Sequence, residues 1–145
     1  MKDTELITCY LRNNNVIKLK HVGFYEGIEI GLLVEGSIYY EDGREVYSPS
    51  CIVGQDDIYL IVVYDWFYTE FTEEEQSIIL AHEYGHKYYR GKDTISSENK
   101  ADLYAVEKFN LDKVINFLKR FSNYYENGGN ILERITWLLN EKLPI

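Results

Sequence analysis

The chain has 145 residues, of which 46% are hydrophobic and 27% charged, and this balance is typical of one folded globular domain rather than of a disordered chain. A formal net charge of −9 repels phosphate backbones and anionic lipid, so neither nucleic acid nor a membrane surface is expected as a partner. No apolar run approaches the roughly 18 residues of a membrane-spanning helix, and residues 1–5 lack the order of a signal peptide, so we expect a cytoplasmic protein.

The first half of the chain is expected to form a short helix and then a small sheet. Apolar residues recur at helical spacing over residues 6–11 behind Thr4, which can cap a helix that ends at residues 13–15. From Val16 to Tyr64, short β-branched and aromatic runs separated by glycines predict strands joined by tight turns. Asp42-Gly43 predicts a hairpin turn, and residues 58–64 are the clearest strand.

After Phe71 the hydrophobic period is helical to the end of the chain. Thr72 and Glu75 have the spacing of a capping box at the start of the first of these helices, and Gly91 predicts its end. Three further helices are expected over residues 96–109, from about residue 112, and over residues 131–139, with a break at residues 127–129. These patterns predict an α+β fold over residues 1–145, with a small N-terminal sheet packed on the first of these helices.

That helix contains the sequence His82-Glu83-Tyr84-Gly85-His86. Residues four apart lie on one face of a helix, so His82 and His86 can bind a single metal ion. Glu83 can reach a metal-bound water as the general base without being a ligand itself. The alternative is a histidine pair without metal, but the apolar pattern of the helix directs both rings inward, where unpaired polar groups are costly.

A catalytic zinc usually has three protein ligands, so a third ligand must come from elsewhere in the chain. Glu98 is the preferred candidate, because it begins the next helix 12 residues after His86 and that helix can return past the metal. Asp102 lies one turn further on and can accept the outer N–H of a ligating imidazole. Two alternatives are that Asp102 is itself the ligand and that the pair belongs to a solvated acidic face. His21 is expected to be solvated or at the edge of the core.

Cys9 and Cys51 form no CxxC pair and no disulfide framework, which suits a reducing compartment. Both are expected to be small, buried apolar side chains. The alternative for Cys51 is that its thiolate caps the metal in a latent form of the protein.

The two motifs together resemble those of a known group of enzymes. His82-Glu83-Tyr84-Gly85-His86 followed by Glu98-Asn99-Lys100-Ala101-Asp102 is similar to the HExxH and ExxAD pair of the gluzincin metallopeptidases. Within that clan the chain resembles the ImmA/IrrE type and the HtpX/Ste24 type, which includes minigluzincins. Residues 105–107 and Glu133-Arg134-Ile135 are closer to the second type, whereas the small size favours the first type or minigluzincins.

The resemblance implies a zincin-like single domain that hydrolyses peptide bonds in a polypeptide substrate. It implies one zinc ion held by His82, His86 and Glu98, with Glu83 as the catalytic base and Asp102 holding a ligand in place. It also implies that the strand at residues 57–64 forms the upper edge of the cleft and pairs with an extended substrate. The residues expected to pair with the substrate are Ile58, Tyr59, Leu60, Ile61 and Val62.

The chain departs from some of these families because no histidine follows His86 to stabilise an oxyanion. Tyr104, Tyr124, Tyr125 or Arg134 could take that role, although each is expected to be structural, with Arg134 as an ion-paired helix residue. A zinc-dependent endopeptidase is therefore the expected function. The alternative is a catalytically silent zincin-like module that binds a regulatory partner.

Overall fold

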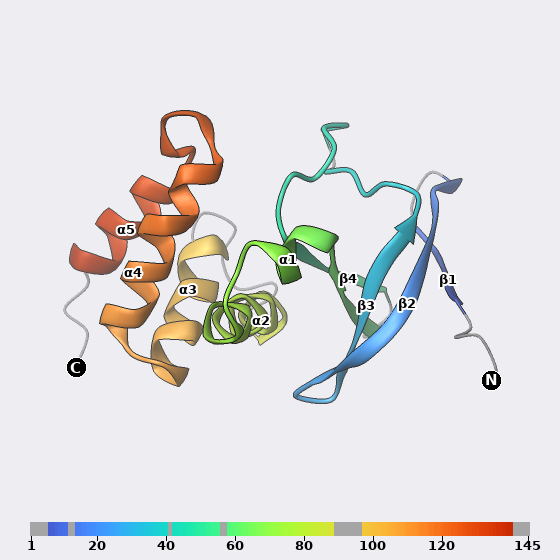
Figure 1. Ribbon diagram of the computed structural model, residues 1–145, viewed down its shortest axis with the longest axis horizontal. Helices are drawn as coiled ribbons and strands as arrows, with labels where there is room; N and C mark the ends of the chain where they lie inside the picture. Colours follow the sequence, from blue (N-terminus) through green and yellow to red (C-terminus); the bar gives the residue numbers. More distant parts are fainter. Residues whose placement is uncertain (1–5, 12–13, 41, 56–57, 89–96, 141–145) are drawn as a thin grey trace. The chain divides into compact units, whose positions relative to one another are not determined.

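The computed structural model of the protein describes residues 6–11, 14–40, 42–55, 58–88 and 97–140 (Figure 1). The fold is α+β, as the sequence predicts, with a five-stranded sheet in the N-terminal part and a mostly helical C-terminal half. The chain divides into two compact units, Met1–Thr72 and Glu73–Ile145. Among the described residues, no helix is both long enough and apolar enough to cross a membrane.

The N-terminal unit contains a mixed sheet with the strand order β1-β2-β3-β5-β4. Neighbouring strands are antiparallel except for β3 and β5, which are parallel. A short helix that the sequence did not predict, α1 (Asp65–Thr69), follows the last strand. The strands are β1 (Leu6–Tyr10), β2 (Val16–Tyr25), β3 (Ile28–Glu35), β4 (Ser50–Gln55) and β5 (Ile58–Val63).

Strand β1 corrects the expectation of a helix over residues 6–11. Alternate residues of β1, Ile7 and Cys9, are half-buried and those between them are exposed, which is the two-residue period of a strand. The apolar residues of this segment satisfy both helical spacing and alternation, so the local pattern does not decide between the two. Antiparallel pairing with β2, from Leu6 opposite Lys20 to Tyr10 opposite Val16, favours the strand.

One face of the sheet holds the core of the N-terminal unit. Ile17 and Leu19 of β2 and Val62 of β5 are fully buried there, and Ile38 and Val46 from the segment between β3 and β4 pack on them. Burial of these branched side chains supplies the driving force that keeps the segment folded over the sheet.

The turn predicted at Asp42-Gly43 lies within that segment. Gly43 has a φ of +92°, which a residue with a side chain rarely adopts. The Tyr40 N–H donates to the carbonyl oxygen of Arg44 at 2.8 Å, and Tyr39 bridges to Glu45, so the segment reverses direction here. The hairpin turn is therefore confirmed.

The C-terminal unit is helical, as predicted. Asn110 caps one helix, since its side chain accepts a hydrogen bond from the Lys113 N–H at 2.8 Å. The predicted break between the last two helices is confirmed by positive φ angles at residues 127–129. Gly91, the predicted end of the first helix, lies outside the described residues. The helices are α2 (Glu73–Tyr88), α3 (Ser97–Lys108), α4 (Leu111–Phe121) and α5 (Ile131–Asn140), with single 3-10 turns at Ser122–Tyr124 and Glu126–Gly128.

Helices α2 and α3 approach each other closely at Gly85. A Cβ added to Gly85 would lie 2.8 Å from the Cα of Ala101, which is closer than real Cβ contacts allow. Gly85 and Ala101 are both buried, and Ala101 is inaccessible to solvent. Two small residues at this crossing let the backbones come together and bring the motif of α2 alongside the first turns of α3.

Candidate metal centre

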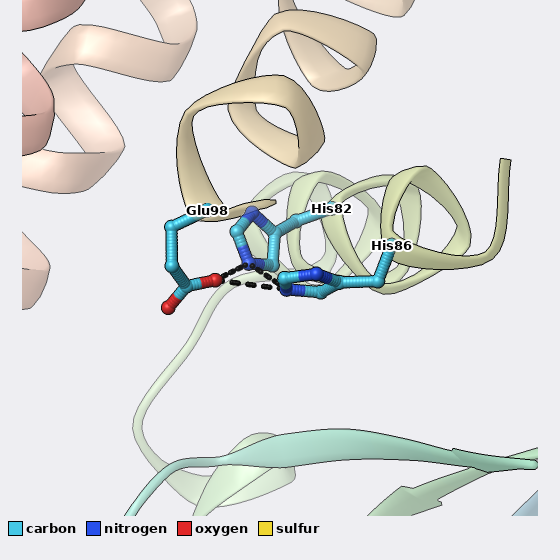
Figure 2. Close-up of side chains that lie close together, drawn as sticks. All are labelled: His82, His86 and Glu98. Atoms are coloured by element: carbon cyan, nitrogen blue, oxygen red, sulfur yellow. Dashed lines mark hydrogen bonds and ion pairs between the residues drawn. The ribbon is translucent and has the colours of Figure 1, made fainter. Parts of the chain in front are cut away.

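Three side chains from α2 and α3 converge on one point (Figure 2). His82 and His86 project from successive turns of α2, and Glu98 lies in the first turn of α3. Glu98 Oε1 is 3.0 Å from His82 Nε2 and 2.8 Å from His86 Nε2. The two Nε2 atoms are 3.1 Å apart. The structure therefore brings together the three residues that the sequence selects as metal ligands.

The spacing of these atoms fits a tetrahedral ion with a small adjustment. Zinc bonds of about 2.0–2.1 Å at tetrahedral angles place ligand atoms about 3.3 Å apart. The three separations, 2.8, 3.0 and 3.1 Å, fall a few tenths of an ångström short of that value.

The hydrogen bond between Asp102 and His82 determines which atoms face the centre. Asp102 Oδ1 lies 2.8 Å from His82 Nδ1, and an ionised carboxylate can only accept a proton. In the neutral ring Nδ1 therefore holds the proton, and Nε2 presents a lone pair toward Glu98 and His86. Lone pairs that face one another at about 3 Å repel unless a proton or a cation lies between them. The donor set therefore fits a metal ion.

Arg134 of α5 fixes the position of Asp102. Its Nε and Nη2 atoms donate to the two carboxylate oxygens of Asp102 at 2.8 and 2.7 Å, in a bidentate pair. The side chains are only 8% and 2% exposed. A third nitrogen, Nη1, lies 3.7 Å from Glu98 Oε2. A buried guanidinium thus orients the carboxylate that in turn orients His82.

The charges of this cluster shift one another's pKa values. Burial alone would lower the pKa of His82, but the adjacent Asp102 and Glu98 carboxylates raise it to about 10. Burial would raise the pKa of Glu98, yet the hydrogen bonds from His82 and His86 hold it well below its usual range. The pKa of Asp102 is likewise lowered, against the effect of burial, by Arg134 and His82. Without a metal, the His82 imidazole is therefore protonated on both ring nitrogens at neutral pH.

Glu83 lies on α2 between the two histidines in sequence and is 6% exposed. Its charge helps to raise the pKa of Arg134, although by less than the charges of Asp102 and Glu98 do. Glu83 is not one of the three converging residues. Its role as the catalytic base stays a prediction.

The topology of the sheet corrects the role expected for the strand at residues 58–62. Strand β5 lies inside the sheet, where Leu60, Ile61 and Val62 pair with β3 on one side and β4 on the other. Strand addition needs an unpaired side, so a substrate cannot add at these three residues. Ile58 and Tyr59 pair with β4 alone. The edge strands of the described sheet are β1 and β4.

The remaining candidate residues have local roles. His21 contacts Glu29 within the N-terminal unit at 2.7 Å, with 42% of its side chain exposed, as expected for a solvated imidazole. Cys9 and Cys51 are free thiols and half-buried, and neither belongs to the converging group. The tyrosines considered as oxyanion donors pack on aromatic neighbours, Tyr104 on Tyr84 and Tyr88, and both Tyr124 and Tyr125 on Phe121.

The pairing of Arg134 with Asp102 is the feature that the sequence did not specify. A signal was present, because the buried positions of α5 follow helical spacing and an arginine occupies one of them. Arginine is almost never fully buried without a partner. Its place on an apolar face therefore predicts a buried acidic partner, although the sequence does not identify which one. The buried residues of α5 are Ile131, Arg134, Ile135 and Leu138.

Comparison of the chain with protein-family models, with curated proteins and with solved structures finds no match. The resemblance to gluzincins therefore stays a prediction that rests on two short motifs. The geometry itself supports a coarser conclusion, which is that His82, His86 and Glu98 form a group that could hold a metal ion.

Proposed function

We propose that the chain is a zinc-dependent endopeptidase in which His82, His86 and Glu98 bind one zinc ion. The observation that supports this proposal most strongly is the convergence of two imidazole nitrogens and one carboxylate oxygen within 3.1 Å of one another. Two histidines and one glutamate form a donor set of catalytic zinc sites, which keep the fourth position for water. Zinc in such a site lowers the pKa of water and polarises a carbonyl group.

The formal charges around the centre also favour a divalent cation. Glu83, Glu98 and Asp102 contribute three negative charges, and Arg134, whose pKa all three raise, contributes one positive charge. With neutral imidazoles the remainder is two negative charges, which one divalent ion balances. Asp102 and Arg134 are buried, and an unbalanced charge beside them would be costly to fold.

The protein's own groups have separate tasks in the proposed reaction. Asp102 holds His82 in the tautomer that presents Nε2 to the metal, and Arg134 holds Asp102. Glu83 accepts a proton from the attacking water and returns it to the nitrogen of the leaving amine. Peptide-bond hydrolysis then needs no covalent intermediate with the chain.

Substitution of Glu83 by Gln tests the proposal directly. The variant Glu83→Gln is expected to keep stoichiometric zinc and to lose cleavage of a diverse peptide pool, because the amide cannot accept the proton. Glu29→Gln is the matched control, since Glu29 is 37% exposed beside His21, and it is expected to cleave at the wild-type rate. Wild-type cleavage by Glu83→Gln would contradict the proposed mechanism.

A catalytically silent zinc module is the second candidate, and one observation favours it. Arg134 already makes two hydrogen bonds to Asp102, which commits it to positioning rather than to stabilising an oxyanion. Full zinc occupancy without turnover of any peptide in a library of several thousand sequences would favour this second function. Cleavage of even one peptide that depends on Glu83 would exclude it.

A further inference from the structure

The two carboxylate oxygens of Glu98 have different neighbours. Oε1 lies beside the two imidazoles, 3.0 Å from His82 Nε2 and 2.8 Å from His86 Nε2. Oε2 points away from both rings (Figure 2) and lies 3.7 Å from Nη1 of Arg134. A carboxylate can bind a metal ion through one oxygen or through both. The structure presents only one oxygen of Glu98 to the candidate centre.

Arg134 is fixed in place by its other contacts. Nε and Nη2 donate to the two carboxylate oxygens of Asp102 at 2.8 and 2.7 Å, and the Arg134 side chain is only 8% exposed. A guanidinium group is planar and rigid, so these two hydrogen bonds also fix the direction of Nη1. The pair with Asp102 therefore sets where the positive charge lies beside Oε2 of Glu98.

The side chain of Glu98 needs such a restraint. It is 44% exposed, whereas the side chains of His82 and Asp102 are 12% and 2% exposed. A half-exposed glutamate has several rotatable bonds, so holding it in one conformation costs rotamer entropy. In the described part of the chain, the ion pair with Arg134 is the contact that engages Oε2. At 3.7 Å this contact is an attraction between charges rather than a direct hydrogen bond.

The number of oxygens that Glu98 supplies decides the geometry of the centre. Two imidazoles, one carboxylate oxygen and one water make four ligands, which is the tetrahedral arrangement of a catalytic zinc site. A second carboxylate oxygen would either add a fifth ligand or take the position of the water. Rotation of Oε2 toward the metal would also separate it from the guanidinium of Arg134. The ion pair therefore opposes binding of the metal through both oxygens.

We propose that Arg134 is a positioning residue that holds Glu98 in one-oxygen ligation and so keeps the fourth position of the metal open for water. The same guanidinium holds Asp102, and Asp102 holds His82. Arg134 therefore positions two of the three metal ligands from a single point on α5. It can have this role only at the metal site of the proposed function, on which the inference therefore rests.

Cobalt(II) bound in place of zinc reports the number of ligands. Four-coordinate cobalt absorbs visible light more strongly than five-coordinate cobalt, and measurement at saturating cobalt removes any difference in affinity. Arg134→Lys keeps a positive charge for Asp102, but its single nitrogen cannot hold Asp102 through two bonds and also lie beside Glu98. The wild type is expected to show strong four-coordinate absorption. The band of Arg134→Lys is expected to be about threefold weaker, because Oε2 joins the metal as a fifth ligand.

Substitution of Glu98 by Gln separates positioning from a merely structural role. An amide binds a metal through its oxygen alone, because its nitrogen is a donor of two protons. Arg134→Lys is therefore expected to leave the band unchanged in the Glu98→Gln background, and an equal loss in both backgrounds would overturn the proposal. Glu98→Gln alone is expected to match the wild-type intensity. A stronger band than wild type would show that Glu98 already binds through both oxygens, which overturns the proposal without any change to Arg134.

Leu138→Ala is the matched control for damage to α5. Leu138 is fully buried one turn after Arg134, so its truncation weakens the packing of the helix and removes no charged group. Its cobalt spectrum is expected to equal that of the wild type, and a loss as large as that in Arg134→Lys would contradict a specific role for Arg134. Bound cobalt with unchanged intensity in Arg134→Lys would overturn this inference alone. A wild type that binds neither cobalt nor zinc would overturn it together with the proposed function.

Discussion

Two histidine–carboxylate contacts, one in each unit, have nearly the same length and different surroundings. His21 Nδ1 lies 2.7 Å from Glu29 Oε2, with the side chains 42% and 37% exposed. His82 Nδ1 lies 2.8 Å from Asp102 Oδ1, with the side chains 12% and 2% exposed. Of the two contacts, only the second belongs to a larger network, because Asp102 also pairs with Arg134 and His82 also contacts Glu98. A short contact alone therefore does not indicate a candidate metal site, whereas the convergence of several ligand groups on one point does.

Removal of a proposed metal ligand should give the largest effect, which is a loss of bound zinc that removal of His21 does not cause. His86→Ala and Glu98→Ala are each expected to lose stoichiometric zinc, because two remaining ligands cannot hold the ion against dialysis. His21→Ala is the matched control and should retain wild-type zinc. Elemental analysis of the purified, dialysed proteins measures all three. Equal zinc in Glu98→Ala and wild type would remove Glu98 from the site.

Removal of Arg134 should have the next largest effect. Arg134→Met leaves the carboxylate of Asp102 buried without its cation, and breaking a buried pair in this way costs about 3–5 kcal/mol. Chemical denaturation of the metal-free protein measures the loss. Arg44→Met removes a guanidinium from a pair with Asp42 that is 74% and 55% exposed, and the unfolding midpoint is expected to stay unchanged. Equal midpoints for the two variants would contradict a structural role for the buried pair.

The close crossing of α2 and α3 gives a third test. Gly85→Ala forces the added methyl group against the backbone of Ala101, and overpacking of this kind costs about 1–3 kcal/mol. Separation of the helices should also move Glu98 away from both imidazoles and weaken zinc binding. Gly23→Ala is the control, because a Cβ at Gly23 meets nothing within 4 Å. Unchanged zinc affinity in Gly85→Ala would show that the crossing does not position the centre.

The pH dependence of zinc binding gives a fourth test. The pKa of His82 is about 10 without metal, so zinc must displace a proton at neutral pH. Affinity should therefore rise by about tenfold per pH unit for each proton released, up to about pH 10. Calorimetry in buffers of different ionisation enthalpy counts the released protons. A proton count of zero at pH 7 would contradict the protonation of His82 in the metal-free protein.

The same pKa shift has the opposite consequence for the stability of the metal-free protein. A histidine whose folded pKa is raised stabilises the fold fully below its unfolded pKa of about 6.5. That contribution is lost as the pH rises through about 10. Alkaline conditions should therefore destabilise the metal-free protein while strengthening zinc binding, so the melting temperature gained on addition of zinc should increase with pH.

The elements that the sequence predicts well are those with a local signature. Helices α4 and α5 have a clear apolar period, and Asn110 provides a cap. Strand β1 was predicted wrongly, because its five residues fit either period and pairing with β2 decides between them. The interior position of β5 was also missed, since the parallel pairing with β3 is non-local and leaves no mark in the sequence of the strand.

The residues of the candidate site likewise differ in how far the sequence predicts them. The spacing of His82 and His86 and the return of the next helix with Glu98 and Asp102 follow from helix geometry, and the structure brings all four together. Arg134 could not be assigned a partner, because 32 residues separate it from Asp102. Its contact depends on how α5 packs on α3, which is a property of the whole helical unit.

The identity of the atoms bound to zinc tests the central claim most directly. X-ray absorption at the zinc edge of the reconstituted protein is predicted to show nitrogen and oxygen ligands at about 2.0–2.2 Å, with scattering from two imidazoles. A sulfur ligand at about 2.3 Å, or a spectrum without imidazole scattering, would contradict a centre built from His82, His86 and Glu98.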